Sequence, residues 1–247
     1  MISKAKIKQL KALQVKKYRK QEQSFVVEGT KSVVELLKSD FSVMWLAGTE
    51  QFLEHNAELL LKVAEVCEAS EKELIAGGSF QTNEGALAIA GMKPNNSLVL
   101  NKSEFALMLD DIRDPGNLGT IIRTADWYGI TKVIASEETA DFYNSKVLSA
   151  TMGSFCRVNL FYTSLETYLA AMTVPVYGTF LDGADVHEQK FEGGGLIVIG
   201  NESNGISPGI EKLITQKITI PRYGKAESLN AGIATGIILD VIRQSKK

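Results

Sequence analysis

Apolar and polar residues alternate along the chain with two periods, one typical of strands and one typical of helices. Short apolar runs, such as LIVIG at 196–200, are typical of strands buried on both faces of a parallel sheet. Stretches with helical spacing of apolar residues separate these runs. In the first part of the chain the pattern predicts strands at 24–28, 41–47, near 66 and 86–90, and helices at 30–38, 50–64 and 70–76.

A polar, proline-containing stretch at 92–97 precedes a second and more regular alternation. Such a stretch is typical of a domain boundary, so we expect a small α/β domain over 1–95 and a larger domain over 96–247. The second pattern predicts an α/β domain with a parallel sheet. Its expected strands are 105–111, 132–136, 157–161, 174–180, 196–200 and 217–220, and its expected helices are 117–128, 144–150, 164–172, 207–215 and 228–244.

The net charge of −2 hides a strong segregation of charge. Residues 1–20 carry eight lysines and arginines and no acid, whereas 21–95 carry twelve acids and five bases. Ile7, Leu10 and Leu13 recur at nearly helical spacing, which predicts a basic amphipathic helix. Two interpretations stay open: a solvated helix face, or an arm that contacts phosphates. A membrane-surface helix is disfavoured because aromatic anchors are nearly absent.

Cysteine and histidine are too scarce for several classes of site. Two cysteines and two histidines, all far apart, exclude a disulfide framework and a zinc site, and they fit a reducing cytoplasm. The composition, with 45% hydrophobic and 23% charged residues, is ordinary for a globular protein. Neither a phosphate-binding P-loop nor a GxGxxG fingerprint follows any expected strand.

Three loops rich in Gly, Asn and Pro instead follow expected strands, where open α/β sheets bind ligands. They contain DDIRDPGNLGTIIRTA at 110–125, IGNESNGIS at 199–207 and ITIPRYGKAESLNAGIA at 218–234. Each has a purely structural alternative. Asn117 and Ser228 can be helix caps, Arg123 the partner of a surface acid, Glu202 ordinary loop charge, and Gly200 a backbone requirement. The joint occurrence of the three loops in this order favours a functional site.

The three stretches resemble the three motifs of the SpoU/TrmH group of S-adenosylmethionine-dependent RNA ribose 2′-O-methyltransferases, in the SPOUT superfamily. The resemblance spans 110 to about 239, and FVVEGTKSVVELL at 25–37 resembles the small substrate-binding domain that often precedes the catalytic one. It implies a parallel α/β sheet with a trefoil knot, a homodimer, S-adenosylmethionine as cofactor and RNA as substrate. No metal is expected, because the methyl group of a sulfonium donor is already activated. Ribosomal RNA is favoured over transfer RNA because a separate recognition domain is present.

The resemblance also assigns residues. The residues that match the catalytic positions of the family are Asn117, Arg123, Glu202, Ser228 and Asn230. The residues that match its cofactor-binding positions are Thr179, Gly200, Asn201, Glu202, Ile220, Pro221, Ser228, Leu229 and Asn230. RNA contacts are expected from Lys4, Lys6, Lys8, Lys11, Lys16, Lys17, Arg19 and Arg123, and Tyr18 either stacks on bases or faces the core. Two departures from the motifs, Arg222 after Ile-Pro and the pair Ser203-Asn204, leave this polar set intact.

A guanidinium is always charged and is therefore a poor general base. We expect Arg123 to hold the ribose–phosphate and to stabilise the developing alkoxide, with the proton leaving through phosphate or water. Glu202 and Ser228 would orient Arg123, and Asn117 and Asn230 would bind the acceptor nucleotide or support the loops. The alternatives are a tRNA ribose methyltransferase, a methyltransferase acting on a base nitrogen, and a catalytically silent RNA-binding or ribosome-assembly protein.

Overall fold

The computed structural model describes residues 1–245, which form two compact units. Unit 1 comprises Met1–Pro94 together with Asp141–Cys156, and unit 2 comprises Asn95–Ala140 together with the described chain from Arg157 onward. The expected division between 95 and 96 places 141–156 in the second domain, whereas these residues pack inside unit 1. Aromatic contacts explain the difference, because the ring of Tyr143 lies 4.5 Å and that of Phe155 6.2 Å from the ring of Phe25.

Unit 1 is built on a four-stranded mixed sheet in the order β1-β4-β2-β3. β4 pairs antiparallel with both β1 and β2, and β3 pairs parallel with β2. The strands are β1 (Ser24–Glu28), β2 (Val43–Gly48), β3 (Val66–Glu68) and β4 (Ala86–Gly91). The helices are α1 (Lys4–Leu13), α2 (Lys16–Glu22), α3 (Thr30–Lys38), α4 (Glu50–His55), α5 (Ala57–Leu60), α6 (Glu71–Gly77) and α8 (Ser145–Thr151), with a 3-10 turn at Ser154–Cys156.

The basic N-terminal segment is part of this unit rather than a free arm. It forms two helices, α1 and α2, in place of the single expected helix. Leu10 and Leu13 are fully buried beside Trp45, Leu74 and Leu87 in the hydrophobic core. The apolar stripe seen in the sequence therefore faces the core, and the lysines between its members are left on the outer side.

Arg19 lies in the interior of unit 1, with 2% of its surface exposed. Its guanidinium donates from Nη2 to Asp141 Oδ2 at 2.6 Å and from Nη1 to the Leu13 carbonyl at 2.8 Å. The expectation that Arg19 contacts RNA is therefore wrong, because its charge is already neutralised and shielded. Nearby, the backbone N–H of Lys93 donates to the Tyr143 hydroxyl at 3.0 Å, and burial raises the pKa of Tyr143 to about 12.

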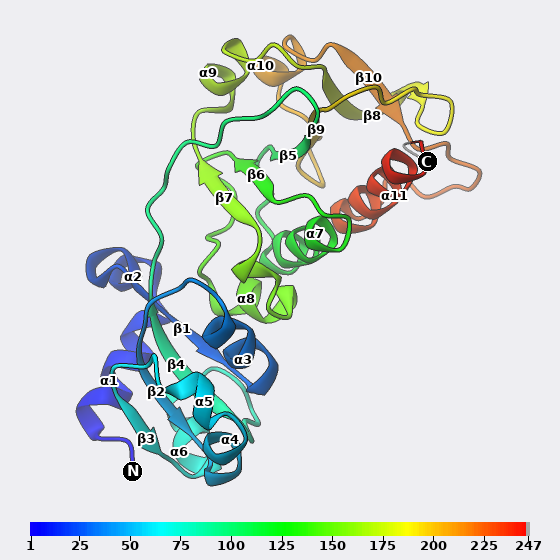
Figure 1. Cartoon of the computed structure of the whole chain (residues 1–247). Helices are drawn as coiled ribbons and strands as arrows, with labels where there is room; N and C mark the ends of the chain where they lie inside the picture. The colour runs from blue at the N-terminus through cyan, green and yellow to red at the C-terminus, as the bar shows by residue number, and fades with distance from the viewer. Residues whose placement is uncertain (246–247) are drawn as a thin grey trace. The chain divides into compact units, whose positions relative to one another are not determined.

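Unit 2 contains a six-stranded sheet in the order β10-β8-β9-β5-β6-β7, in which every neighbouring pair is parallel. This confirms the α/β class with a parallel sheet. The strands are β5 (Phe105–Leu109), β6 (Lys132–Ala135), β7 (Asn159–Tyr162), β8 (Val176–Asp185), β9 (Gly195–Ile199) and β10 (Gln216–Thr219). The helices are α7 (Pro115–Trp127), α9 (Leu165–Ala170), α10 (Pro208–Glu211) and α11 (Ala231–Gln244), and α7 and α11 lie side by side (Figure 1).

Several elements differ from the expected ranges. In unit 1 the helix expected over 50–64 forms two short helices, α4 and α5, and in unit 2 three elements differ most. Strand β8 continues to Asp185, because its second half pairs with β10 after a shift in register between Lys217 and Ile218. Helix α10 is a single turn that ends at Glu211, and α11 begins at Ala231 rather than at 228. The residues before α11 thus form a loop, which places the third motif at the rim of the sheet.

The strand order creates a switch point between β5 and β9. The chain leaves β5 toward β6 on one side of the sheet, and it leaves β9 toward β10 on the other side. Connections that diverge in this way open a crevice at the carboxyl ends of the two strands, where α/β proteins bind ligands. The first and second motif loops follow β5 and β9, so both lie at this crevice.

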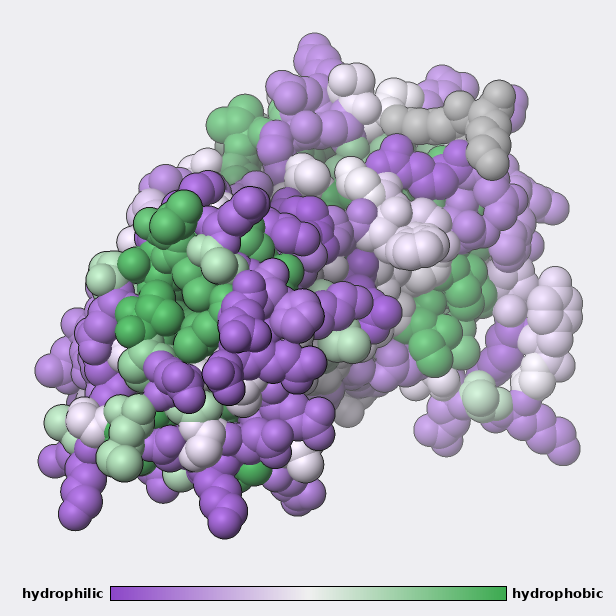
Figure 2. Space-filling view, turned by 60° about the horizontal axis from the view of Figure 1, so that its bottom comes forward, coloured by the Kyte–Doolittle hydropathy of each residue, from purple (hydrophilic) through white to green (hydrophobic). Residues whose placement is uncertain are grey.

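The described residues include no helix with the length and apolar character needed to span a bilayer. Hydrophilic residues dominate the face drawn in Figure 2, with separate apolar areas between them. The largest exposed apolar side chains of unit 2 include Trp127, Leu181 and Tyr223. These aromatic and aliphatic groups are available to ligands or partners, because the fold does not bury them.

Candidate active site

The first motif places Asn117 in the opening turn of α7. Asp114 caps this helix, because its carboxylate accepts the N–H of Asn117 at 2.8 Å, and Pro115 occupies the first helical position. Asn117 is therefore not the cap, and its side chain is available to the other loops. This excludes the interpretation of Asn117 as a mere helix cap.

The third motif contributes Asn230, which caps α11. Its Oδ1 accepts the N–H groups of Gly232 at 3.0 Å and Ile233 at 3.2 Å, and its Nδ2 donates to Asn117 Oδ1 at 2.7 Å. Ser228 is therefore not a cap either. It lies with Leu229 in the exposed loop before the helix.

The second motif completes a chain of hydrogen bonds. Asn117 Nδ2 donates to Glu202 Oε1 at 2.5 Å, so Asn230, Asn117 and Glu202 are linked although they come from three separate loops. The structure thus brings together three of the five polar residues assigned to catalysis. Glu202 contacts Asn117 and not Arg123, which differs from the orienting role expected for it.

The loop that carries Glu202 is a tight, closed turn. Asn201 and Gly205 exchange two backbone hydrogen bonds at 3.0 and 2.9 Å, and Asn201 Oδ1 accepts the N–H groups of Ser203 and Asn204. A Cβ atom on Gly200 would lie 2.3 Å from the backbone carbon of Gly205, so no larger residue fits there. Gly200 is therefore required by the close approach of the backbone, which allows the turn to fold back on β9.

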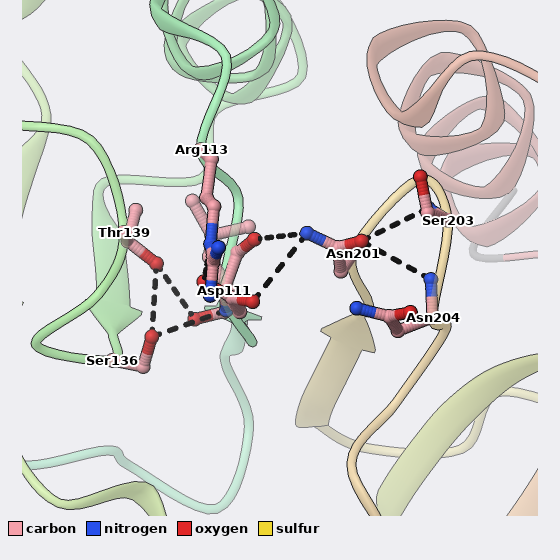
Figure 3. A network of polar contacts seen from close by, with 8 residues as sticks. Asp111, Arg113, Ser136, Thr139, Asn201, Ser203 and Asn204 are labelled. Carbon is pink, nitrogen blue, oxygen red and sulfur yellow. Dashed lines mark hydrogen bonds and ion pairs between the residues drawn. The ribbon is translucent and has the colours of Figure 1, made fainter.

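Sequence reasoning missed the network that joins this turn to the first motif (Figure 3). Asp111 has a left-handed φ of 60°, its N–H donates to Ser136 Oγ at 3.1 Å, and its carbonyl accepts Asn201 Nδ2 at 2.7 Å. Its carboxylate accepts Arg113 Nε at 2.7 Å, and this hydrogen bond raises the pKa of Arg113. A residue other than glycine at positive φ is uncommon. Here the hydrogen bonds to Ser136 and Asn201 hold Asp111 in this conformation.

Helix α11 approaches α7 closely at its first turns. A Cβ on Gly232 would lie 2.8 Å from Thr120 Cγ2, and one on Gly236 would lie 3.8 Å from Thr124 Cγ2. The small residues after Asn230 therefore allow close packing of the two helices. This close contact between α7 and α11 also holds Asn230 within hydrogen-bonding distance of Asn117. The packing of the two helices therefore sets the geometry of the site.

Arg123 lies on the exposed side of α7. Within residues 1–245 the structure shows no hydrogen bond or ion pair to its guanidinium, so the alternative of pairing with a surface acid receives no support. Six residues after Asn117, it is displaced along the helix by about 9 Å. The guanidinium fork is available to an external anion.

Most residues assigned to the cofactor follow the carboxyl ends of β9 and β10, and Thr179 lies in the first half of β8. Gly178 pairs with Val198, so Thr179 lies level with Ile199, next to Gly200. Ile220 and Pro221 follow β10 directly and are half-buried. Hydroxyl, backbone amide and half-buried apolar groups, without a cluster of charge, fit a nucleoside with a short polar tail. Among the described residues, no group of three or more His, Cys, Asp or Glu side chains is placed to hold a metal ion.

Most of the basic side chains expected to contact RNA lie on the surface of α1 and α2. Lys4, Lys8, Lys11, Lys16 and Lys17 are exposed. Lys6 is partly covered, with its Nζ 5.2 Å from the ring centre of Trp45 and 4.0 Å from Glu65 Oε2. Tyr18 is exposed and does not face the core.

A parallel α/β sheet with three polar loops at the carboxyl ends of its strands defines unit 2 as an α/β ligand-binding domain. Residues 104–240 match the model of the SpoU rRNA Methylase family, and residues 4–88 match an MRM3-like substrate binding domain. The chain belongs to the SpoU rRNA methylase family.

Individual relatives agree along nearly the whole chain. It is 32% identical over 243 residues to the 23S rRNA (guanosine(2553)-2'-O)-methyltransferase RlmP of Bacillus subtilis, covering 96% of each protein. It is 28% identical to the 23S rRNA (guanosine-2'-O-)-methyltransferase RlmB of Neisseria meningitidis, covering 89% of this chain and 90% of that one. The solved structure of an AdoMet-bound rRNA methyltransferase from Sinorhizobium meliloti matches with a TM-score of 0.87 at 30% identity, covering 99% and 96%.

Proposed function

We propose that this protein transfers a methyl group from S-adenosylmethionine to a ribose 2′-hydroxyl of ribosomal RNA. The observation that carries the proposal is the hydrogen-bonded chain from Asn230 through Asn117 to Glu202, which unites the three motifs. Relatives that share nearly the full length of the chain are named as 23S rRNA 2'-O-methyltransferases. These names favour ribosomal over transfer RNA and an active enzyme over a silent binding protein.

The cofactor, when bound, supplies a methyl group already activated on a sulfonium sulfur. Thr179, Gly200, Ile220 and Leu229 would hold its nucleoside, with further contacts from the neighbouring residues Asn201, Glu202, Pro221, Ser228 and Asn230. The chain's task is then to align the ribose oxygen with the methyl carbon, and such positioning contributes up to about 7–11 kcal/mol. Arg123 holds the ribose–phosphate and stabilises negative charge on the attacking oxygen.

In this proposal the protein acts in the cytoplasm as a homodimer, and its catalytic domain contains a trefoil knot. Exposed apolar side chains at α7 and α11, including Trp127 and Ile233, support a protein partner at these helices. Localisation to the cytoplasm is supported by the reduced state of Cys67 and Cys156, neither of which forms a disulfide within the described residues, and by an rRNA substrate.

The decisive experiment offers the purified protein labelled S-adenosylmethionine with separated rRNA and tRNA fractions, followed by nucleoside mapping. We expect label in a 2′-O-methylated nucleoside of the large rRNA. Cofactor binding by calorimetry accompanies the assay. Label in a base-methylated nucleoside or in tRNA alone would contradict the proposal, and so would cofactor binding without transfer to any RNA.

The lysines of α1 and α2 provide a second prediction, because a cluster of exposed cations favours phosphate contacts. Deleting 1–20 would also remove Leu10 and Leu13 from the core, so substitution is the sharper test. Replacing the exposed Lys4, Lys8, Lys11, Lys16 and Lys17 with glutamine is expected to flatten the salt dependence of binding to a 23S rRNA transcript by about one unit of slope per lost contact.

The matched control replaces exposed lysines of unit 2, Lys102, Lys190 and Lys212, with glutamine. These substitutions change the net charge of the chain without touching α1 or α2. Their salt slope should stay near that of the unaltered protein. An equal flattening in both variants would show that charge acts over the whole molecule and that α1 and α2 have no special role.

A further inference from the structure

The hydrogen bonds that join the three motifs have a defined direction. Asn230 Oδ1 accepts two backbone N–H groups at the start of α11, and backbone N–H groups can only donate. The other end of the Asn230 amide must therefore be its NH2 group, which donates to Asn117 Oδ1. The start of α11 therefore fixes which end of the Asn230 side-chain amide is the oxygen and which is the NH2 group.

The same logic sets the second amide and the acid beyond it. Because Asn117 Oδ1 is the acceptor for Asn230, the Asn117 NH2 group must point toward Glu202 and donate to Oε1. An ionised carboxylate can only accept hydrogen bonds, so it satisfies this arrangement completely. The two asparagines therefore form a directional relay that ends on Glu202 Oε1 as the acceptor.

Glu202 lies in a closed turn and uses one of its two carboxylate oxygens. Its turn is closed by the paired backbone groups of Asn201 and Gly205 and by the Asn201 side chain. Oε1 is used by Asn117, whereas Oε2 has no hydrogen bond to any residue within 1–245. The neighbouring acids are occupied: Asp111 pairs with Arg113, and Asp114 caps α7.

We infer that Glu202 is the proton acceptor for the ribose 2′-hydroxyl, and that Asn117 and Asn230 are positioning residues that act through it. This inference rests on the proposed methyl transfer. The 2′-oxygen forms a bond to the methyl carbon as the bond from carbon to the sulfonium sulfur breaks, and that electron pair stays on sulfur. The hydroxyl proton moves to Glu202 Oε2 and is later released to water. Arg123 cannot take this proton because it is always charged.

The test compares Glu202→Gln with Glu202→Ala in steady-state methylation of a 23S rRNA transcript. Glutamine can still accept the Asn117 amide but cannot take a proton, so we expect kcat to fall about 100-fold or more. Added formate should restore activity to Glu202→Ala in a concentration-dependent way, because a small carboxylate can occupy the vacated space. It should not restore Glu202→Gln, whose side chain fills that space.

A substitution of Asn230 separates the orienting role of the two asparagines from their contribution to the stability of the fold. Asn230→Asp can still accept both N–H groups of α11, so the helix cap is preserved, but it cannot donate to Asn117. We expect an unfolding temperature near that of the unaltered protein and a kcat that falls at least tenfold. A Glu202→Gln kcat above one tenth of the unaltered value, or no formate rescue of Glu202→Ala, would overturn the inference. Failure of the unaltered protein to methylate any RNA would instead overturn the proposed function.

Discussion

Substitution of Arg123 by lysine is expected to lower kcat for RNA methylation by about 100-fold, with S-adenosylmethionine affinity unchanged. Lysine keeps the charge but loses the planar fork that binds a phosphate or ribose oxygen through two parallel hydrogen bonds. Removing one donor aimed at a developing oxyanion typically costs about 10²–10³ in kcat. Arg123 is exposed, so the substitution should leave the unfolding temperature unchanged.

The measurement is steady-state transfer of labelled methyl to a 23S rRNA transcript, with calorimetry of cofactor binding alongside. Arg157→Lys is the matched control, because Arg157 is also an exposed arginine of unit 2 but is paired with Asp126. We expect the control to retain its kcat. A nearly unaltered rate for Arg123→Lys would mean that the fork geometry has no role, and the proposed function of Arg123 would be abandoned.

Substitution of Arg19 by alanine is expected to destabilise the protein by about 3–5 kcal/mol, which is the usual cost of breaking a buried ion pair on one side. The side chain is almost fully enclosed, and its removal takes away the donors that it supplies to Asp141 Oδ2 and to the Leu13 carbonyl. Urea unfolding followed by tryptophan fluorescence measures the change, because Trp45 lies in the core of unit 1.

Two comparisons make this prediction specific. A double variant that removes both Arg19 and Asp141 should lose less than the sum of the two single changes, because no uncompensated charge remains. The exposed pair of Lys217 and Glu211 should contribute no more than about 1 kcal/mol when it is broken. A loss below 1 kcal/mol for Arg19→Ala would contradict the interpretation that this pair joins 141–156 to α2.

The element pattern of the chain was predictable because each strand and helix leaves a local signature. The buried run at 196–200 forms β9 with its last residue just beyond the strand, and the predicted helix 30–38 matches α3. The predicted bounds were wrong where contacts with residues distant in the sequence decide where an element ends or begins. The second half of β8 exists because β10 pairs with it, and the helix expected from 228 starts at 231 because Asn230, tied to Asn117, forms the cap.

The candidate site was predictable as a set of motifs but not as a geometry. Asn117, Glu202 and Asn230 were identified from three separate stretches, and the structure joins them in one hydrogen-bonded chain. The direction of that chain and the orientation of each amide follow only from their three-dimensional contacts. Asp111 and Ser136 were missed because nothing in the local sequence distinguishes a supporting acid or hydroxyl from ordinary strand-end residues.

The sequence by itself determined the class of the fold, the order of its elements and the three motifs, because apolar periodicity and turn residues are local properties. The tertiary structure alone decided that Arg19 is buried against a residue 122 positions away and that 141–156 belongs to unit 1. It also decided that Glu202 contacts Asn117 rather than Arg123. These facts depend on which distant surfaces are buried together, and burial is a property of the packed chain that no local pattern encodes.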